Sequence, residues 1–307
     1  MDKRPLLAFF AICGLDLLDS LPSDRQALIE WIYSMQYVDE DADTAGFLGG
    51  FIIGRDNSGK QSPLDVPSLG ITYTALASLI TLGDDLERVK RTQILKGLTR
   101  LQLEDGSFAS QWFDGEVDMR FVYCAVSVAY MLNDLSTIDT DRCVQFIRSC
   151  VTYEGGVGCV PGAEAHGGST FCAVASLALL GRLEDISDHR SKLIRWCLFR
   201  QASSGFNGRP NKMEDTCYSF WVGGTLHMLD AFNLSSATQN RNFLLSAQNP
   251  IKGGLGKHDH QEPDPHHTYL GMAGLSFIQE DELGEMHIPL NIPERAHRRL
   301  REIHAKW

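Results

Sequence analysis

The chain has 307 residues, of which 43% are hydrophobic, so it is long enough to form one large hydrophobic core or two smaller ones. Its formal net charge of −11, with basic residues clustered only near the C-terminus, argues against a general nucleic-acid-binding protein. No apolar run reaches the length of about eighteen residues that a transmembrane helix needs. The cysteines show neither a CxxC pair nor a disulfide-like spacing, so we expect a soluble, cytoplasmic protein with reduced thiols.

Glycine-containing turns divide the chain at a constant interval. The apolar residues that close these turns are Phe108, Val157, Phe206 and Leu255, each 49 residues after the one before. A degenerate fifth copy lies at 45–47. Each turn follows an amphipathic segment and precedes, after a loop, a segment that is apolar nearly all round, which is the pattern of alternating surface and buried helices. A repeat of this length indicates a helical-repeat architecture.

The predicted helices alternate between these two kinds in chain order. The segments that are apolar on nearly every side are 6–18, 70–82, 119–132, 168–180, 217–230 and 268–278. The amphipathic segments are 25–36, 88–102, 139–151, 187–201, 238–249 and 292–305. An open solenoid needs polar caps at both ends, and the first helix is apolar, so we expect the last helix to cover the first one and close a ring. The prediction is an all-α protein with an α6/α6 toroid fold, in a single domain over 1–307 built from about five helical-pair repeats.

Potential metal ligands recur where the apolar helices begin. Counted from the residue that closes the preceding turn, Asp215 is at position 9, Cys217 at position 11 and His267 at position 12. Carboxylate, thiolate and imidazole are ordinary ligands of Zn²⁺, and three protein ligands leave a fourth position for a substrate. On spacing alone, the alternative is a helix-capping aspartate, a packed cysteine and a surface histidine.

A second group combines cations with hydrogen-bond donors. Arg209 and Lys212 precede Cys217, while His166 and Tyr218 lie at the starts of two apolar helices. Fixed cations and directed donors near helix N-termini suit a diphosphate, although an exposed basic loop explains the two cations equally well.

The apolar helices also carry large side chains. These include Phe10, Phe121, Tyr123, Cys172 and Trp221. They are core residues in most helical proteins, but in a ring too wide for side chains to fill they would line a pocket for a long isoprenoid.

The blocks around these residues resemble the β-subunits of protein prenyltransferases. The matching blocks are 118–124, 164–172, 208–221 and 267–276. The resemblance implies a heterodimer with an α-subunit, which transfers an isoprenoid from its diphosphate to the cysteine of a C-terminal CaaX tail on small GTPases. It implies that one Zn²⁺ is held by Asp215, Cys217 and His267.

The resemblance also assigns the remaining site residues. The diphosphate site comprises His166, Arg209, Lys212 and Tyr218. The isoprenoid pocket comprises Arg120, Tyr123, Cys172, Trp221 and Leu6. Phe10 and His266 fall in the pocket for the peptide tail.

Within the family, the chain resembles the type I geranylgeranyl branch more than the farnesyl or Rab-directed branches. Leu6 stands where farnesyl enzymes have a tryptophan that closes the pocket floor, which implies room for the longer isoprenoid. Phe10 favours a terminal leucine on the CaaX tail, whereas His266 stands where an apolar side chain is usual. Lys257 replaces an aspartate that assists Mg²⁺ in farnesyl enzymes, so we expect Lys257 to act among the catalytic residues and Mg²⁺ not to be required.

Other classes of protein share parts of this pattern. A farnesyltransferase β-subunit is the nearest alternative, and a terpene-cyclase-like toroid is a more remote one. The chain lacks the DxDD acid motif of protonation-initiated cyclases. A toroid that only binds proteins would explain the repeat but not the clustered Asp, Cys, His, Arg and Lys residues.

Overall fold

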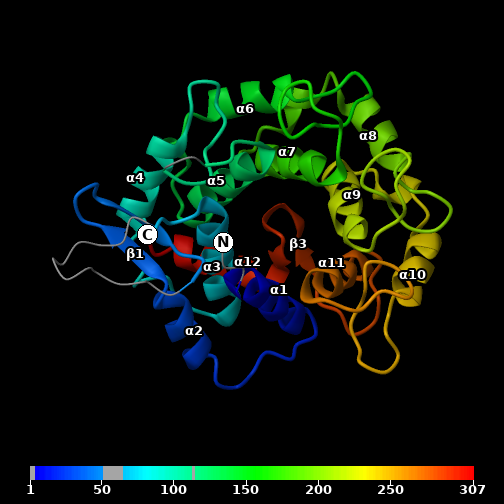
Figure 1. Cartoon of the computed structure of the whole chain (residues 1–307), viewed down its shortest axis with the longest axis horizontal. Helices are drawn as coiled ribbons and strands as arrows, with labels where there is room; N and C mark the ends of the chain where they lie inside the picture. The colour runs from blue at the N-terminus through cyan, green and yellow to red at the C-terminus, as the bar shows by residue number, and fades with distance from the viewer. Residues whose placement is uncertain (1–3, 51–64, 113–114) are drawn as a thin grey trace.

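Helices form two concentric layers around a ring (Figure 1). The computed structural model describes residues 4–50, 65–112 and 115–307. The inner helices are α1 (Arg4–Leu17), α3 (Leu69–Leu82), α5 (Met119–Met131), α7 (Gly167–Leu179), α9 (Cys217–Met228) and α11 (Pro265–Ser276). Each inner helix packs against the next, and α11 packs against α1, which closes the ring.

The outer helices alternate with the inner ones in sequence. They are α2 (Gln26–Tyr33), α4 (Arg91–Leu101), α6 (Thr140–Ser149), α8 (Arg190–Leu198), α10 (Ala237–Ser246) and α12 (Glu294–His304). Short 3₁₀ helices are η1 (Leu135–Thr137), η2 (Leu183–Ile186), η3 (Phe232–Leu234) and η4 (Ile288–Leu290). The predicted helices all form, and the α6/α6 toroid is confirmed.

Burial explains why the two kinds of helix occupy different layers. Every residue of α3 except Gly70 is buried, because this helix has neighbours on nearly all sides. In α6 the buried residues are confined to one stripe, which includes Phe146 and Ile147, while Arg148 is exposed on the other side. The inner layer therefore requires apolar or small residues nearly everywhere, and the outer layer requires only one apolar face.

The glycine turns fold back onto the ends of the outer helices. The residue that closes each turn forms an antiparallel bridge with a residue just after the preceding helix: Gln102↔Phe108, Val151↔Val157, Gln201↔Phe206 and Gln248↔Leu255. Glycine is required at position 106, where φ is +89° and an added Cβ atom would lie 2.0 Å from the carbonyl oxygen of Arg142. The fifth copy is a longer hairpin of β1 (Gln36–Asp39) and β2 (Thr44–Phe47), which the repeat pattern did not predict.

The C-terminal segment departs from the prediction. Helix α12 packs mainly against α3, whereas the prediction placed it over α1, which it joins through the ion pair of Arg295 with Asp16. The η4 turn contacts α7 and α9. Strands β3 (Met286–His287) and β4 (Ile292–Pro293) pair on either side of η4. The hydroxyls of Tyr73 and Tyr269 each donate to a carbonyl of this segment at 2.8 Å, those of Leu290 and Asn291. The segment lies across the inner helices because the apolar side chains of Leu290 and Ile292 are fully buried there.

None of the helices within the described ranges combines the length and the apolarity that crossing a membrane requires.

Candidate functional site

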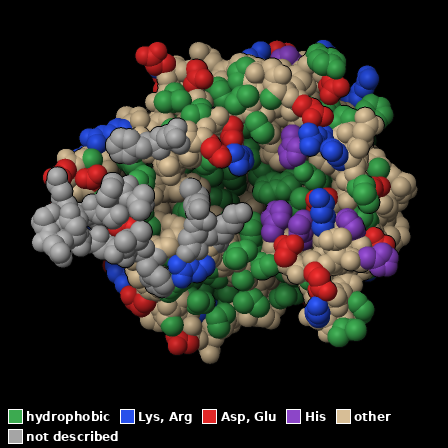
Figure 2. Space-filling view, in the orientation of Figure 1, with side chains coloured by type: hydrophobic (Ala, Val, Ile, Leu, Met, Phe, Trp, Pro, Cys, Tyr) green, Lys and Arg blue, Asp and Glu red, His purple; other side chains and the backbone are tan. Residues whose placement is uncertain are grey.

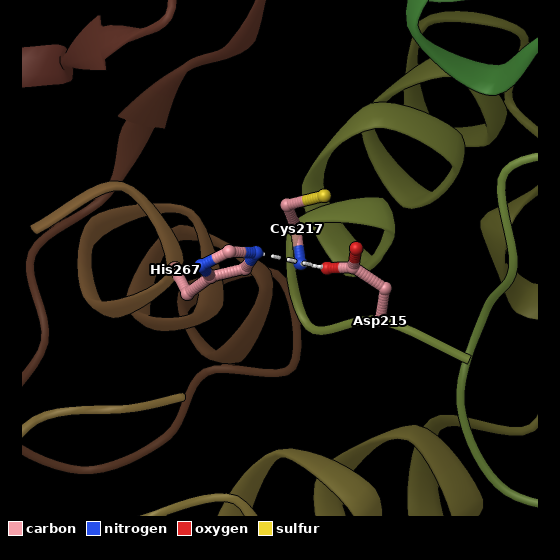
Figure 3. Close-up of side chains that lie close together, drawn as sticks. All are labelled: Asp215, Cys217 and His267. Carbon is pink, nitrogen blue, oxygen red and sulfur yellow. Dashed lines mark hydrogen bonds and ion pairs between the residues drawn. The ribbon is translucent and has the colours of Figure 1, made fainter. Parts of the chain in front are cut away.

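Three potential metal ligands converge where α9 and α11 begin (Figure 3). Asp215 and Cys217 lie at the start of α9, and His267 lies in the first turn of α11. One ligand atom from each residue lies within 4.8 Å of the other two, and Nε2 of His267 is 3.4 Å from Oδ1 of Asp215. The structure thus brings together the three predicted ligands, in a group that can hold a metal ion.

The start of α9 is fixed by the repeat itself. The backbone N–H of Asp215 donates to the carbonyl of Phe206, which closes the preceding turn, at 3.0 Å. Oδ1 of Asp215 accepts from the N–H of Cys217 at 3.0 Å, so the carboxylate caps the helix. The N–H of Thr216 donates to the carbonyl of Lys257 at 2.9 Å, which ties the next repeat to this helix start.

Asp264 holds the third potential ligand in place. This residue caps α11: its Oδ1 accepts from the N–H of His267 at 3.0 Å, and its Oδ2 lies 2.5 Å from Nδ1 of the same residue. With the Nδ1 proton directed at Asp264, the lone pair on Nε2 is left for a metal ion. The predicted site did not include Asp264, although its register indicated a related position, because Asp264 and Asp215 are both nine residues after the closing residue of their turns.

All three potential ligands have shifted pKa values. Burial raises the pKa of Asp215, but hydrogen bonds from His267 and Cys217 outweigh this effect and lower the pKa to about 2. Burial lowers the pKa of His267, but hydrogen bonds with Asp215 and Asp264 outweigh it, so the pKa is raised. Burial and the adjacent Asp215 carboxylate raise the pKa of Cys217 well above its usual value. A metal ion among these groups would reverse that last effect and favour the thiolate.

Lys257 approaches the same carboxylate from the other side. Its Nζ atom lies 3.6 Å from Oδ2 of Asp215, and its side chain is about half exposed. The two oxygens of Asp215 therefore face different side chains, because Oδ1 faces Nε2 of His267 and Oδ2 faces the ammonium of Lys257.

Tyr218 and His166 form a second pair, between α9 and the start of α7. The hydroxyl oxygen of Tyr218 lies 2.9 Å from Nε2 of His166, and Nδ1 of His166 accepts from the N–H of Gly168 at 3.1 Å. Burial and the nearby Arg209 lower the pKa of His166, which favours the neutral ring. A neutral ring that accepts at Nδ1 carries its proton on Nε2 and donates it to Tyr218, so the Tyr218 hydroxyl proton is available to a ligand.

The cations predicted to bind diphosphate lie on the loop before α9. Arg209 is paired with Glu164 at 2.8 Å, and Lys212 is exposed and forms no ion pair within the described part of the chain. Gly208 lies against the Tyr218 ring, where an added Cβ atom would come within 2.2 Å of Cζ, so only glycine fits. Figure 2 shows basic and histidine side chains gathered on one side of a central hollow.

The floor of this hollow is apolar in Figure 2. Tyr123, Cys172 and Trp221 lie on the consecutive inner helices α5, α7 and α9. Phe171 joins two of them, with ring-centroid distances of 5.7 Å to Tyr123 and 4.9 Å to Trp221. Such an arrangement forms a continuous apolar wall.

The remaining predicted residues lie on α1, α5 and α11. Leu6 is half-buried on α1. Arg120 lies at the start of α5, where its guanidinium donates to Asp118 at 2.6 Å and to Glu116 at 2.8 Å, so carboxylates hold it. The rings of Phe10 and His266 are 5.0 Å apart. His266 in turn lies 4.8 Å from the ring of His267, which places the predicted peptide pocket beside the metal-ligand cluster.

A helical toroid with a potential metal site at one end is typical of a known class of proteins. A family model described as "Prenyltransferase alpha-alpha toroid domain" matches residues 1–292. The chain belongs to this family.

Particular relatives narrow the class further. The chain is 37% identical to a geranylgeranyl transferase type-1 subunit beta from Dictyostelium discoideum, over 94% of this chain and 88% of that protein. It is 36% identical to a protein of the same name from Arabidopsis thaliana, over 95% and 82% of the two chains. The structure of Candida albicans protein geranylgeranyltransferase-I complexed with GGPP matches with a TM-score of 0.88 and 25% identity, over 98% of this chain and 92% of that one. These matches confirm the predicted resemblance to the type I β-subunits and the predicted class of enzyme.

Proposed function

We propose that this chain is the β-subunit of a zinc-dependent protein geranylgeranyltransferase type I. It acts in the cytoplasm as a heterodimer with an α-subunit. The enzyme transfers geranylgeranyl from geranylgeranyl diphosphate to the cysteine of C-terminal CaaX tails on small GTPases, with leucine preferred at the last position. The observation that carries this proposal is the convergence of Asp215, Cys217 and His267 within 4.8 Å. The same end of the toroid bears the predicted diphosphate-binding residues His166, Arg209, Lys212 and Tyr218, which we call the diphosphate cradle.

The set of donor atoms fits zinc. One sulfur, one nitrogen and one oxygen ligand favour Zn²⁺ over Mg²⁺ or Ca²⁺, which prefer oxygen ligands. When bound, Zn²⁺ stabilises a substrate thiol as its thiolate at neutral pH. Asp264 contributes by holding the imidazole of His267 in the required orientation.

The diphosphate cradle stabilises the leaving group. In the reaction, a carbon–sulfur bond forms at C1 of the isoprenoid as the carbon–oxygen bond to the diphosphate breaks, and the thiol loses its proton. Negative charge then grows on the diphosphate. The Tyr218 hydroxyl, oriented by His166, donates a hydrogen bond to this charge, while Arg209 and Lys212 supply fixed positive charge.

The apolar wall on α5, α7 and α9 binds the isoprenoid. Aromatic contacts among Tyr123, Phe171 and Trp221 give this wall a fixed shape. The similar Candida albicans enzyme was solved as a complex with GGPP, which supports the same ligand here.

The metal is tested by elemental analysis of the chain purified with a co-expressed α-subunit. We expect one equivalent of zinc, lost in His267→Ala and retained in His260→Ala, because the His260 side chain is 92% exposed. A zinc-free wild-type heterodimer that remains active would contradict the proposal. Zinc also separates it from a terpene-cyclase-like toroid, which does not require this metal.

The type I assignment is tested by competition. Farnesyl and geranylgeranyl diphosphate are supplied together with peptide tails that end in leucine or serine. We expect geranylgeranyl transfer to the leucine tail to be faster. Faster farnesylation of the serine tail would identify a farnesyltransferase β-subunit instead and would leave the fold and the metal site unaffected.

A further inference from the structure

A second pocket, of about 530 Å³, lies on the outer layer of the toroid. Its walls come from α8 and the residues just after it, from the turn after α6, and from Pro210. We call it the α8 pocket. Its lining shares no residue with the diphosphate cradle of His166, Arg209, Lys212 and Tyr218, although Pro210 is the neighbour of Arg209 in sequence.

The α8 pocket concentrates positive charge that carboxylates do not neutralise. Lys192, Arg195 and Arg200 line it, and none of them forms an ion pair within the described part of the chain. The acidic residue in the lining is Glu154 alone, among the residues that the structure describes. Many other arginines are paired, as Arg148 is with Asp188. On a chain with a net charge of −11, an unpaired group of three cations is suited to an anionic ligand.

Arg200 is the buried member of the three cations. The residue is only 8% exposed, and its guanidinium donates to neutral acceptors, the carbonyl of Trp196 at 3.4 Å and Oδ1 of Asn207 at 3.3 Å. Burial lowers the pKa of Arg200, so the surrounding carboxylates do not offset the loss of water. Trp196 also lines the pocket, and its buried Nε1–H has no acceptor among the described residues. A buried charge whose acceptors are neutral and distant is costly, as is a buried donor without an acceptor, and an anion would satisfy both groups.

The pocket walls are closely packed rather than loose. Gly155, with φ of +104°, lies so close to the backbone of Lys192 that an added Cβ atom would come within 2.6 Å. A Cβ atom on Gly156 would lie 2.6 Å from the Trp196 ring. The turn after α6 therefore packs directly on α8, and the pocket is preformed.

Two exposed aromatic residues complete the lining. Tyr153 is 90% exposed and Phe199 is 65% exposed, although side chains of this size are usually buried. The guanidinium of Arg195 lies 5.6 Å from the centroid of the Phe199 ring. The pocket thus combines cations with apolar surface that a ligand can cover.

We propose that the α8 pocket binds a phosphate monoester, with the phosphate on Lys192, Arg195 and Arg200 and the organic group on Phe199 and Tyr153. Three cations and one carboxylate leave two uncompensated positive charges. A phosphate monoester carries a charge of about −1.5 to −2 at neutral pH and offers acceptor oxygens to guanidinium groups. The same chemistry is present in a soluble phosphate monoester and in the headgroup of a lipid such as phosphatidic acid.

The test uses the chain co-expressed with an α-subunit and two probes. Phenyl phosphate is titrated by calorimetry, and phosphatidylcholine vesicles with and without phosphatidic acid are tested by co-sedimentation. We expect the double variant Lys192→Gln/Arg195→Gln to bind the effective probe about tenfold more weakly or worse. Arg298→Gln removes an exposed arginine elsewhere and should bind like the wild type. Prenyl transfer should be unchanged in both variants.

The two probes distinguish a soluble ligand from a lipid headgroup. Binding of phenyl phosphate alone supports a soluble ligand, and binding of phosphatidic acid vesicles alone supports a lipid headgroup, provided that the double variant loses it. Failure of the wild type to bind either probe would overturn the proposal. Equal binding by the wild type and the double variant would also overturn it. A third variant, Lys212→Gln, alters the diphosphate cradle, and a loss of binding confined to this variant would place the anion there and overturn the proposal. None of these results depends on the proposed prenyl transfer.

Discussion

The Nδ1 atom of His267 lies 2.5 Å from Oδ2 of Asp264, the residue that also caps α11. One carboxylate therefore fixes both the helix start and the side chain of a predicted metal ligand. In Asp264→Asn, the amide is a weaker partner for the imidazole, so we expect zinc affinity to fall about 10- to 100-fold. Competition with a chromogenic chelator measures this affinity. Asp259→Asn, in the exposed loop nearby, is the control, and an unchanged affinity in Asp264→Asn would show that the contact serves only the helix cap.

Tyr218→Phe removes the hydroxyl that lies 2.9 Å from His166 and keeps the ring that packs on Gly208. Because the hydroxyl stabilises charge that develops during the reaction, we expect kcat to fall about 10- to 100-fold, with a smaller effect on KM for the isoprenoid diphosphate. Steady-state kinetics separate the two constants. Tyr130→Phe, on the far part of α5, should have little effect on either. A change confined to KM would mean that Tyr218 binds the ground state only.

Lys257 lies 3.6 Å from Asp215, where a cationic group can offset diphosphate charge without Mg²⁺. We expect full turnover with Zn²⁺ in buffers free of Mg²⁺, and lower turnover in Lys257→Ala that Mg²⁺ partly restores. Turnover across a Mg²⁺ titration measures this. Lys252→Ala, whose ammonium pairs with Glu262 at 2.7 Å, is the matched control. A large Mg²⁺ stimulation of the wild type would contradict the assigned role.

Arg295 joins the C-terminal helix to α1 through Asp16, at 2.6 Å. The Asp16 side chain is only 3% exposed, and burial raises its pKa although Arg295 opposes this effect. Loss of the guanidinium leaves a buried carboxylate without its main partner, so we expect Arg295→Ala to lower the free energy of unfolding by about 2 kcal/mol. Urea denaturation measures the change. Asp19→Asn removes only the exposed partner of Arg295 and should cost much less. Equal effects would show that the buried contact contributes little.

His287 stacks on His297 with ring centroids 3.5 Å apart, at the point where the C-terminal segment crosses the inner helices. Burial and the neighbouring His297 lower the pKa of His287 to about 3, below the value of about 6.5 expected in the unfolded chain. The unfolded state therefore binds more protons between these values. The stability that depends on a neutral His287 is fully present above about pH 6.5 and is lost as the pH falls toward 3, by up to about 1.4 kcal/mol per pH unit.

The variant His287→Phe keeps a ring for the stack and removes the titration. We expect a shallower loss of stability between pH 7 and pH 5 than in the wild type, measured by urea denaturation at each pH. His260→Phe, at an exposed position, should follow the wild-type slope. Identical slopes in His287→Phe and the wild type would show that other groups control acid sensitivity.

Local pattern was sufficient to predict the layers of this fold. The interval of 49 residues and the contrast between helices with one apolar stripe and helices such as α3, which is apolar nearly all round, are properties of the chain itself. They determine the layer of each helix, because a helix that is apolar on all sides must be buried and a helix with one apolar stripe lies at the surface. The register of Asp215, Cys217 and His267 was likewise visible, because equivalent positions of a closed repeat lie at the same height.

Only the tertiary structure decided which side chains from different repeats meet. It placed Asp264 against His267, buried Arg200 against the neutral amide of Asn207, and packed α12 mainly against α3 while η4 contacts α7 and α9. These outcomes depend on the curvature of the ring and on side-chain rotamers, which the repeat interval does not specify. A helix leaves a periodic pattern in its own sequence, whereas an ion pair or a buried charge depends on atoms that folding alone brings within a few ångströms.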